Sequence, residues 1–326
     1  MRPGIEDGFA RSCYAAPDRI VVATALTDLE YLAPQAIAHA EAAGAELIFF
    51  HAVVPDAPPA KATYYNPLKA DRDARLTLEV LSRHVRARNV DCTVTVRHGQ
   101  PAELLDEFLR ERPSGRLMVG ARATGDGDSN RLGSTARQML LQTPIPVCVL
   151  PPETLERNGK RSTAGETGAG CREGGGKRPR TILYTVGESG PQSEGVRFAQ
   201  DLAQYFHAEL VLWKISNRNS STSGPTPISC SAGLWPRMLQ IDGNDASITA
   251  LLAAVRDNSA DMILIEVPPS LGSGACIPAT LAELVAQASC PVLTFPVLPL
   301  DRQHPGLRVL PNLHSGLDST STAGAH

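Results

Sequence analysis

The sequence has few aromatic residues, and neither sign of charge is in clear excess. Aromatics make up 5% of the 326 residues, which favours cores packed by Val, Leu, Ile and Ala. The 31 Lys and Arg nearly balance the 34 Asp and Glu, giving a formal net charge of −3. No stretch approaches the roughly 20 apolar residues that span a bilayer, and residues 1–17 lack the apolar segment of a secretory signal. We therefore expect a cytoplasmic protein with neither a membrane nor a nucleic acid as partner.

Cysteine and histidine are also sparse and lack the spacings that hold metals. The seven cysteines are scattered without a Cys-x-x-Cys pair, and the eight histidines include no His-Glu-x-x-His. This pattern favours reduced thiols over a disulfide frame or a zinc site, so no metal is predicted. The sequence also lacks a Gly-Lys-Ser/Thr motif, a Gly-x-Ser-x-Gly motif, and a Ser-Gly-Gly loop after the first predicted strand. The last absence counts against an ATP pyrophosphatase on a related fold, and no turnover chemistry is expected.

Buried strands and helical patterns alternate through the first 151 residues. The ranges 18–24, 46–53, 92–96, 117–120 and 146–150 are short, apolar and rich in β-branched residues. Between them, amphipathic spacing predicts helices over about 30–43, 68–88 and 102–112, and another that starts at Ser134 or Thr135 and ends before Pro144. Leu76, Leu78, Val80, Leu81 and Val85 are among the apolar positions of the second helix. The alternation predicts a parallel α/β sheet with right-handed crossovers.

The second half of the chain repeats this organisation. A polar, glycine-rich segment, 152–179, predicts a disordered linker, and 180–297 then echoes 18–151 in its first strand, helix and second strand and again near its end. Residues 1–17 and 298–326 are predicted to be a flexible leader and a disordered tail. The copies differ at 217–240, where the long amphipathic helix is shortened or lost. That loss predicts an apolar face that another surface must cover.

One loop in the first half resembles a family signature. Gly120, then Gly133 followed by Ser134, have the spacing of the universal stress protein family, in which Gly, two residues, Gly, nine residues and Gly-Ser/Thr follow one another. Ala123 stands where the family has its second glycine. A strand, a glycine-bearing loop and a helix N-terminus together form a potential anion site, because unpaired N–H groups and the helix dipole point at the loop.

The resemblance implies a fold and a ligand. It implies two doubly wound, Rossmann-like parallel sheets of five strands in the order 3-2-1-4-5, similar to the adenine-nucleotide alpha-hydrolase fold and packed as an internal pseudo-dimer. It also implies a site for ATP or another adenine nucleotide in the first half. The residues carried over to that site are Ala52, Val119, Gly120, Arg122, Gly133, Ser134 and Thr135.

Two features of the first half weaken this expectation. Ala25 occupies the family's acidic position, with Asp28 three residues further on. Ala123 adds a methyl group where the backbone approaches a phosphate, and Arg122 could compensate with a charged contact. The alternative is that the glycines only permit a tight connection and that Ser134 is a plain N-cap. A histidine at a strand end, His51, is interpreted as structural.

The second half is a poorer candidate. Glu266 stands in place of Gly120, and Pro278-Ala279-Thr280 replaces Gly133-Ser134-Thr135, so phosphate binding is not expected there. The first hypothesis for the whole chain is therefore a universal stress protein-like regulator with at most one nucleotide site. The second is an interaction scaffold that recruits a protein partner or forms a homodimer, and a slow ATPase is a distant third.

Overall fold

The computed structural model describes most of the two predicted halves. The described residues are 16–54, 66–112, 114–122, 132–143, 145–154, 178–186, 194–215, 226–227, 238–243, 247–267 and 279–296. Nearly all of the predicted leader and linker, the whole tail, Ala123 and Pro278 lie outside these residues. Expectations about those segments, including the limits of the two domains, stay predictions.

The first half contains the predicted alternation of strands and helices. The strands are β1 (Arg19–Ala23), β2 (Glu46–Val53), β3 (Cys92–His98), β4 (Arg116–Gly120) and β5 (Val147–Leu150), and the helices are α2 (Leu29–Ala43), α3 (Pro67–Arg86), α4 (Pro101–Glu111) and α5 (Ser134–Gln142). Gly44 ends α2 in the left-handed conformation, with φ of 62°, as glycine permits at this position. Pro101 begins α4, where its missing N–H leaves no hydrogen bond unmade.

The second half shows a similar succession with one difference. Its elements are β6 (Thr181–Val186), α7 (Glu194–Phe206), β7 (Glu209–Ile215), β8 (Thr226–Pro227), β9 (Met238–Gly243), α8 (Ile248–Asp257), β10 (Met262–Val267), α9 (Ala279–Gln287) and β11 (Val292–Pro296). Among the described residues between β7 and β9 there is only the short strand β8, and no helix like α3. The side chains of β9 and of the expected apolar face lie outside the part whose burial is described.

The strand order matches the expected topology. The sheet runs β3-β2-β1-β4-β5-β11-β10-β6-β7-β9-β8. The first five strands have the expected order 3-2-1-4-5, and β9-β7-β6-β10-β11 is the equivalent order in the second half. All neighbours within each half are parallel except the added edge strand β8.

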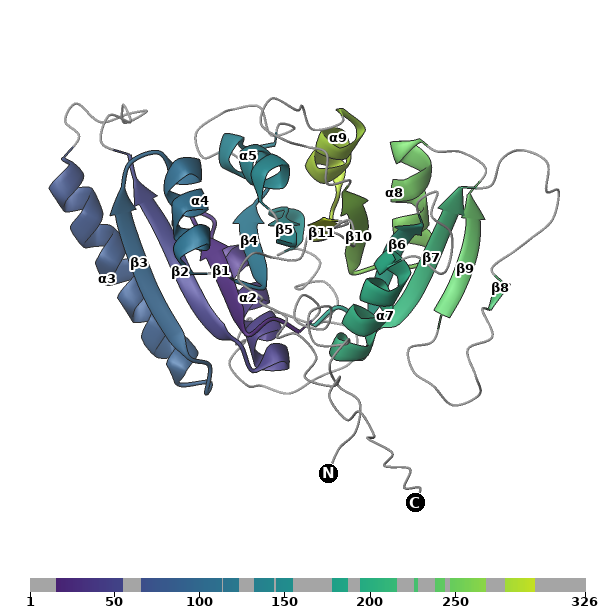
Figure 1. The fold of residues 1–326 in the computed structure, drawn as a ribbon, viewed down its shortest axis with the longest axis horizontal. Coiled ribbons are helices and arrows are strands. Elements are labelled where there is room, and N and C mark those ends of the chain that lie inside the picture. The colour runs from purple at the N-terminus through teal and green to yellow at the C-terminus, as the bar shows by residue number, and fades with distance from the viewer. Residues whose placement is uncertain are drawn as a thin grey trace, which may run out of the picture.

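The two five-stranded sheets are continuous with each other (Figure 1). Strands β5 and β11 pair antiparallel, with Val149 opposite Val292 and Cys148 opposite Leu293. The hydroxyl of Thr294 adds a hydrogen bond of 3.2 Å to the carbonyl of Val147. The halves therefore meet edge to edge along their last strands, and neither last strand is left as an open edge.

Helices cover both faces of this continuous sheet (Figure 1). One buried cluster includes Leu32 of α2, Leu78 of α3 and Leu202 of α7. The other includes Leu105 of α4 and Leu284 of α9, on the opposite face. Each cluster contains residues of both halves, so the apolar cores extend across the junction.

A polar contact also links the halves on the α2 and α7 side. The hydroxyl of Tyr205 donates to the carbonyl of His39 at 2.8 Å, and the ring of His39 lies 4.8 Å from that of Phe206. The guanidinium of the fully buried Arg116 donates to Nδ1 of His39 at 3.1 Å. Residues from both halves thus form one buried cluster.

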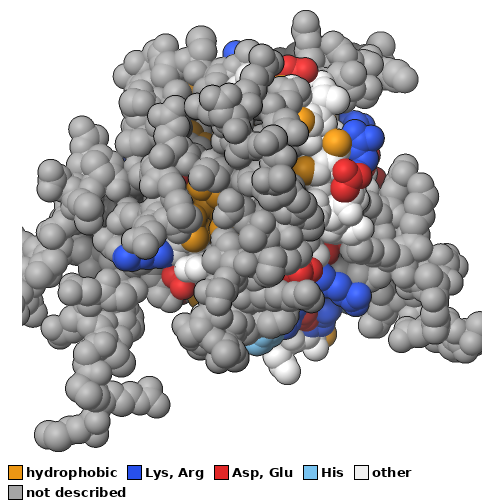
Figure 2. Space-filling model, turned by 90° about the vertical axis from the view of Figure 1, so that its right-hand side faces the viewer, with side chains coloured by type: hydrophobic (Ala, Val, Ile, Leu, Met, Phe, Trp, Pro, Cys, Tyr) orange, Lys and Arg blue, Asp and Glu red, His pale blue; other side chains and the backbone are white. Residues whose placement is uncertain are grey.

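The outer face of α3 differs from the simple amphipathic expectation. Leu78 and Val85 are buried, whereas Leu76 is 56% and Val80 67% exposed. The apolar character of the helix is therefore not confined to its core face. At the opposite end of the molecule, described hydrophobic side chains appear only as small separate areas beside charged ones (Figure 2).

Candidate functional site

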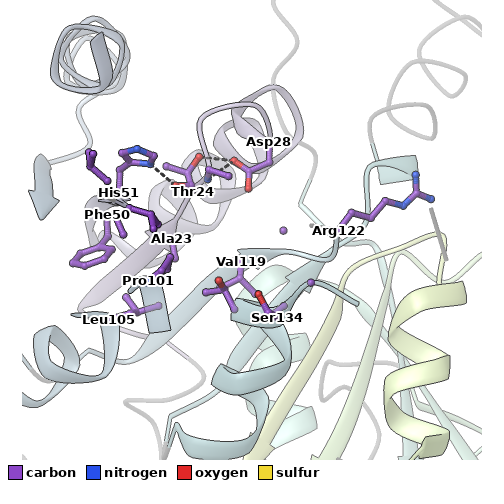
Figure 3. A pocket seen from close by; sticks show the side chains of 18 of the residues that line it. Ala23, Thr24, Asp28, Phe50, His51, Pro101, Leu105, Val119, Arg122 and Ser134 are labelled. Carbon is purple, nitrogen blue, oxygen red and sulfur yellow. Dashed lines mark hydrogen bonds between the residues drawn. The ribbon is translucent and has the colours of Figure 1, made fainter. Parts of the chain in front are cut away.

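A cavity of about 420 Å³ lies at the carboxyl ends of the first-half strands. Its walls come from the ends of β1, β2 and β4 and from the first residues of α4 and α5 (Figure 3). Strands β1 and β4 are neighbours whose connections leave in opposite directions, which is the place where ligands bind in open parallel sheets. The volume is within the range of pockets that hold small molecules.

Every site residue predicted from the sequence lines this cavity. Ala52 comes from β2, Val119 and Gly120 from β4, and Arg122 from the residues just after it; Gly133, Ser134 and Thr135 come from the start of α5. Arg122 and Leu132 form an isolated antiparallel bridge beside this region. The N–H of Gly133 also donates to the carbonyl of Ala121 at 2.8 Å.

The start of α5 leaves backbone donors facing the cavity. Gly133 is the N-cap and makes no side-chain capping bond, and Ser134 is already the first helical residue. Ser134 is therefore not the N-cap, whereas the other part of that alternative, that the glycines only permit a tight connection, stays a prediction. Within the described ranges, no hydrogen bond is seen from the N–H groups of Ser134, Thr135 or Ala136 to protein acceptors. Such donors at a helix N-terminus suit an anion.

Asp28 is the acidic group of the cavity. It is the N-cap residue of α2 and is 7% exposed. Its Oδ1 accepts hydrogen bonds from the hydroxyl of Thr24 at 2.5 Å and from the N–H of Ala25 at 3.1 Å. Burial raises the pKa of the Asp28 carboxyl, against the lowering effect of these hydrogen bonds. A carboxylate is thus present although Ala25 occupies the expected acidic position.

Gly120 lets Asp28 and Tyr31 approach the end of β4. A Cβ placed on Gly120 would lie 2.7 Å from the hydroxyl of Tyr31 and 2.9 Å from Oδ2 of Asp28. Both distances are too short for ordinary contacts. The glycine therefore allows α2 to pack against β4. Its spacing in the sequence did not indicate this packing role.

His51 lies on the β2 wall, opposite Ser134 (Figure 3). Its Nδ1 is 2.8 Å from the carbonyl of Thr24. Because a carbonyl only accepts, Nδ1 carries the proton of the neutral ring, and Nε2 can accept a hydrogen bond from a ligand. The sequence interpretation of His51 as structural fits Nδ1, which is held by the Thr24 carbonyl. It did not predict that His51 lines the cavity.

Arg122 is turned away from the other labelled residues of the cavity (Figure 3). Its Nη2 donates to Oε1 of Glu153, which follows β5. Both side chains are partly exposed, at 35% and 38%. The guanidinium that was expected to compensate for Ala123 is therefore already paired with a carboxylate.

Sequence reasoning did not assign Thr24, Asp28, His51, Pro101 or Leu105 to the site. A signal for Asp28 was present, because it precedes the helix that follows the first strand, at the switch point of the sheet. Pro101 and Leu105 belong to α4, which follows β3 in the chain and packs on the same face of the sheet as α5 (Figure 1). No local motif marks that approach.

The equivalent place in the second half is built differently. Ile263 of β10 pairs with Leu183 of β6, and Leu117 of β4 pairs in the same way with Val21 of β1. Glu266 and Gly120 follow these residues at the same distance along their strands, so Glu266 takes the position of Gly120. Its Oε2 accepts a hydrogen bond of 2.9 Å from the hydroxyl of Tyr184. Helix α9 begins with Ala279 and Thr280, where α5 has Ser134 and Thr135. A carboxylate thus occupies the end of β10.

The described residues include neither a candidate metal site nor a candidate membrane-spanning helix. Their His, Cys, Asp and Glu side chains nowhere gather in groups of three that could hold a metal ion. None of their helices has both the length and the apolar character needed to cross a bilayer.

Comparison with solved structures supports the fold of both halves. A universal stress protein from Archaeoglobus fulgidus DSM 4304 matches with a TM-score of 0.61 at 12% identity, over 87% of this chain and 97% of that one. A functionally unknown protein from Pseudomonas aeruginosa PAO1 matches with a TM-score of 0.55 at 13% identity, over 87% and 94%. A putative universal stress protein from P. aeruginosa UCBPP-PA14 matches with a TM-score of 0.53 at 13% identity, over 87% and 95%.

The sequence comparisons cover less of the chain. No curated protein matches it significantly. Residues 17–151, which carry β1 to β5 and the whole cavity, match the universal stress protein family. The strand order of this segment, β3-β2-β1-β4-β5, agrees with that match.

Proposed function

We propose that the first half binds one adenine nucleotide weakly and that the protein acts as a regulator without turnover chemistry. The observation that carries the proposal is the convergence of seven residues, expected from the family signature, on one cavity of about 420 Å³. They come from separate parts of the chain and meet at the switch point of the sheet. The match of this segment to the universal stress protein family supports adenine as the base.

Each wall of the cavity suits one part of a nucleotide. Ala52, Val53 and Val119 offer small apolar surfaces for a flat base. The Asp28 carboxylate can accept hydrogen bonds from ribose hydroxyls, as acidic residues do in related sheets. The first-turn N–H groups of α5 and the hydroxyls of Ser134 and Thr135 can donate to a phosphate.

Binding without turnover agrees with how the polar groups are engaged. Oδ1 of Asp28 is occupied by Thr24 and Ala25, and Nδ1 of His51 is held by the carbonyl of Thr24. These groups are fixed as parts of the wall. In this proposal, the protein with an occupied site differs in stability and surface from the protein with an empty site. A partner would bind one of these two states in preference to the other.

The proposal gives the second half, 180–297, a structural part. Glu266 stands at the position of Gly120 and accepts a hydrogen bond from Tyr184. We expect this half to support the first through the shared sheet and to bind no nucleotide. Recruitment of a protein partner or a second copy of the chain stays a prediction.

A matched pair of variants tests the proposal. Thr135→Glu places a carboxylate in the first turn of α5, and Thr280→Glu places one at the equivalent turn of α9. An acidic residue at a helix N-terminus does not destabilise the helix, so both variants should fold. At a ligand concentration of ten times Kd, AMP should stabilise the parent chain by about 1.4 kcal/mol.

The readout is thermal unfolding with and without AMP. Thr135→Glu should abolish the stabilisation, and Thr280→Glu should leave it unchanged. A parent chain that shows no shift with millimolar AMP or ATP would remove the nucleotide proposal. Equal losses in both variants would show that the site is not confined to the first half.

A further inference from the structure

Arg122 is the one Lys or Arg among the described residues that line the cavity. Its guanidinium donates to the carboxylate of Glu153 and points away from the cavity centre (Figure 3). A guanidinium paired with a carboxylate attracts a phosphate less strongly than a free one, because the carboxylate offsets its charge. The cation at this edge of the site is therefore already neutralised.

A second carboxylate lies at the same edge. Oδ2 of Asp28 would be 2.9 Å from a Cβ on Gly120, so it faces the end of β4, where the signature loop begins. The pKa of the nearby Tyr31 phenol is raised by burial first and by Asp28 second; Arg122 opposes the rise and Glu153 adds to it. Glu30 also adds to the rise, so around Tyr31 the carboxylates outnumber the one guanidinium.

We infer that Asp28 and Glu153 make this site select adenine ligands of low negative charge, namely the nucleoside or the monophosphate, over the triphosphate. The inference rests on the proposed nucleotide function and names its ligand class. The start of α5 can favour one phosphate group of about two negative charges. Each further phosphate brings charge towards Asp28 and Glu153, and the described lining of the cavity offers it no lysine or arginine besides the paired Arg122.

Glu153 is the residue that sets this selectivity without being part of the base or ribose pocket. Replacing it by Gln keeps the shape of the side chain and an oxygen that can accept from Arg122. It removes one negative charge and loosens the hold on the guanidinium. Arg122 then becomes available to a β- or γ-phosphate.

The experiment is calorimetric titration of the full chain with adenosine, AMP and ATP in a chelating buffer, so that ATP keeps its full charge. The parent chain should bind AMP about tenfold more tightly than ATP, and Glu153→Gln should bring the two affinities within about threefold of each other. Glu46→Gln is the matched control. Glu46 pairs with Arg19 at 3.0 Å with similar exposure, but at the start of β2, the end of the sheet opposite the cavity.

Each outcome decides a different claim. A smaller AMP preference in Glu153→Gln, with Glu46→Gln behaving like the parent, supports the inference. A parent that binds ATP as tightly as AMP, or a preference that Glu153→Gln leaves unchanged, overturns it while adenine binding stands. If no adenine ligand binds the parent chain, the proposed function fails together with the inference.

Discussion

The hydroxyl of Tyr31 lies 2.7 Å from the point where a Cβ on Gly120 would stand. Tyr31 is a buried residue of α2, and Gly120 ends β4. The missing side chain of the glycine therefore allows a helix of the first crossover to close over the end of the fourth strand. Asp28, one turn earlier on the same helix, is brought to the cavity by this close approach.

Gly120→Ala should destabilise the protein by about 1–3 kcal/mol, because the added methyl group overpacks the contact with Tyr31 and Asp28. Adding Tyr31→Phe, which removes the hydroxyl, should recover part of that loss. Urea denaturation of the two single variants and the double variant gives the coupling between the two positions. Strictly additive effects would contradict the proposed contact.

Asp28→Asn should change how stability depends on pH. Burial raises the pKa of Asp28 above its ordinary value of 3.8, so the folded state favours the protonated acid. The stabilising contribution of that proton is complete below about pH 3.8 and is lost as the pH rises through the folded pKa. The stability of Asp28→Asn relative to the parent should therefore increase from pH 4 towards neutrality. A difference that does not vary with pH would contradict this argument.

His39→Gln should act in the opposite pH direction. Burial first, and Arg116 second, hold the pKa of His39 well below 6.5. Since unfolded chains bind the proton more readily, the stabilising contribution of neutral His39 is present above pH 6.5 and is lost as the pH falls. The slope is at most about 1.4 kcal/mol per pH unit.

In His39→Gln, the amide oxygen can still accept from Arg116, but it does not titrate. Denaturation curves between pH 7 and pH 5 should show a shallower loss of stability in the variant than in the parent. Parallel losses would show that His39 is not the group responsible.

Tyr184→Phe should weaken the second half without affecting the ligand site of the first. The Tyr184 hydroxyl donates to the carboxylate of Glu266 at 2.9 Å, and removing such a donor costs about 1.5–3 kcal/mol because the acceptor is charged. Chemical denaturation should report that loss. AMP titration of the folded variant should give the parent affinity, and a weakened affinity would mean that the halves are coupled more directly.

Most of the first-half fold could be predicted from the sequence. The ranges around β1, β2, β4 and β5 are apolar on both faces, as strands of a covered parallel sheet must be, and Gly44 and Pro101 mark a helix end and a helix start. These are local signals. The strand order 3-2-1-4-5 is not local, and it came from the family resemblance.

The parts that were missed depend on contacts between distant segments. The continuity of the sheet through Val149 and Val292 requires knowing which edges are free. The pairing of Arg122 with Glu153 joins residues 31 positions apart. Helix α8 was also missed, although Ser247 caps its first turn.

The residues of the candidate site also divide into those that a local motif predicts and those that depend on contacts between distant segments. Gly133, Ser134 and Thr135 could be placed from a spaced motif, since a glycine loop before a helix has one local structure. Asp28 and His51 come to the cavity from elements that precede that motif by about 70 to 100 residues. Their positions in the cavity depend on the packing of α2 and on the register of β1 with β2.

The number of adenine ligands bound per chain tests the central claim most directly. Calorimetric titration of the full chain with AMP should give one site per chain, and Thr135→Glu should reduce this to none. Two sites per chain, or binding that survives Thr135→Glu, would contradict the account that only the first half keeps a helix start able to hold a phosphate.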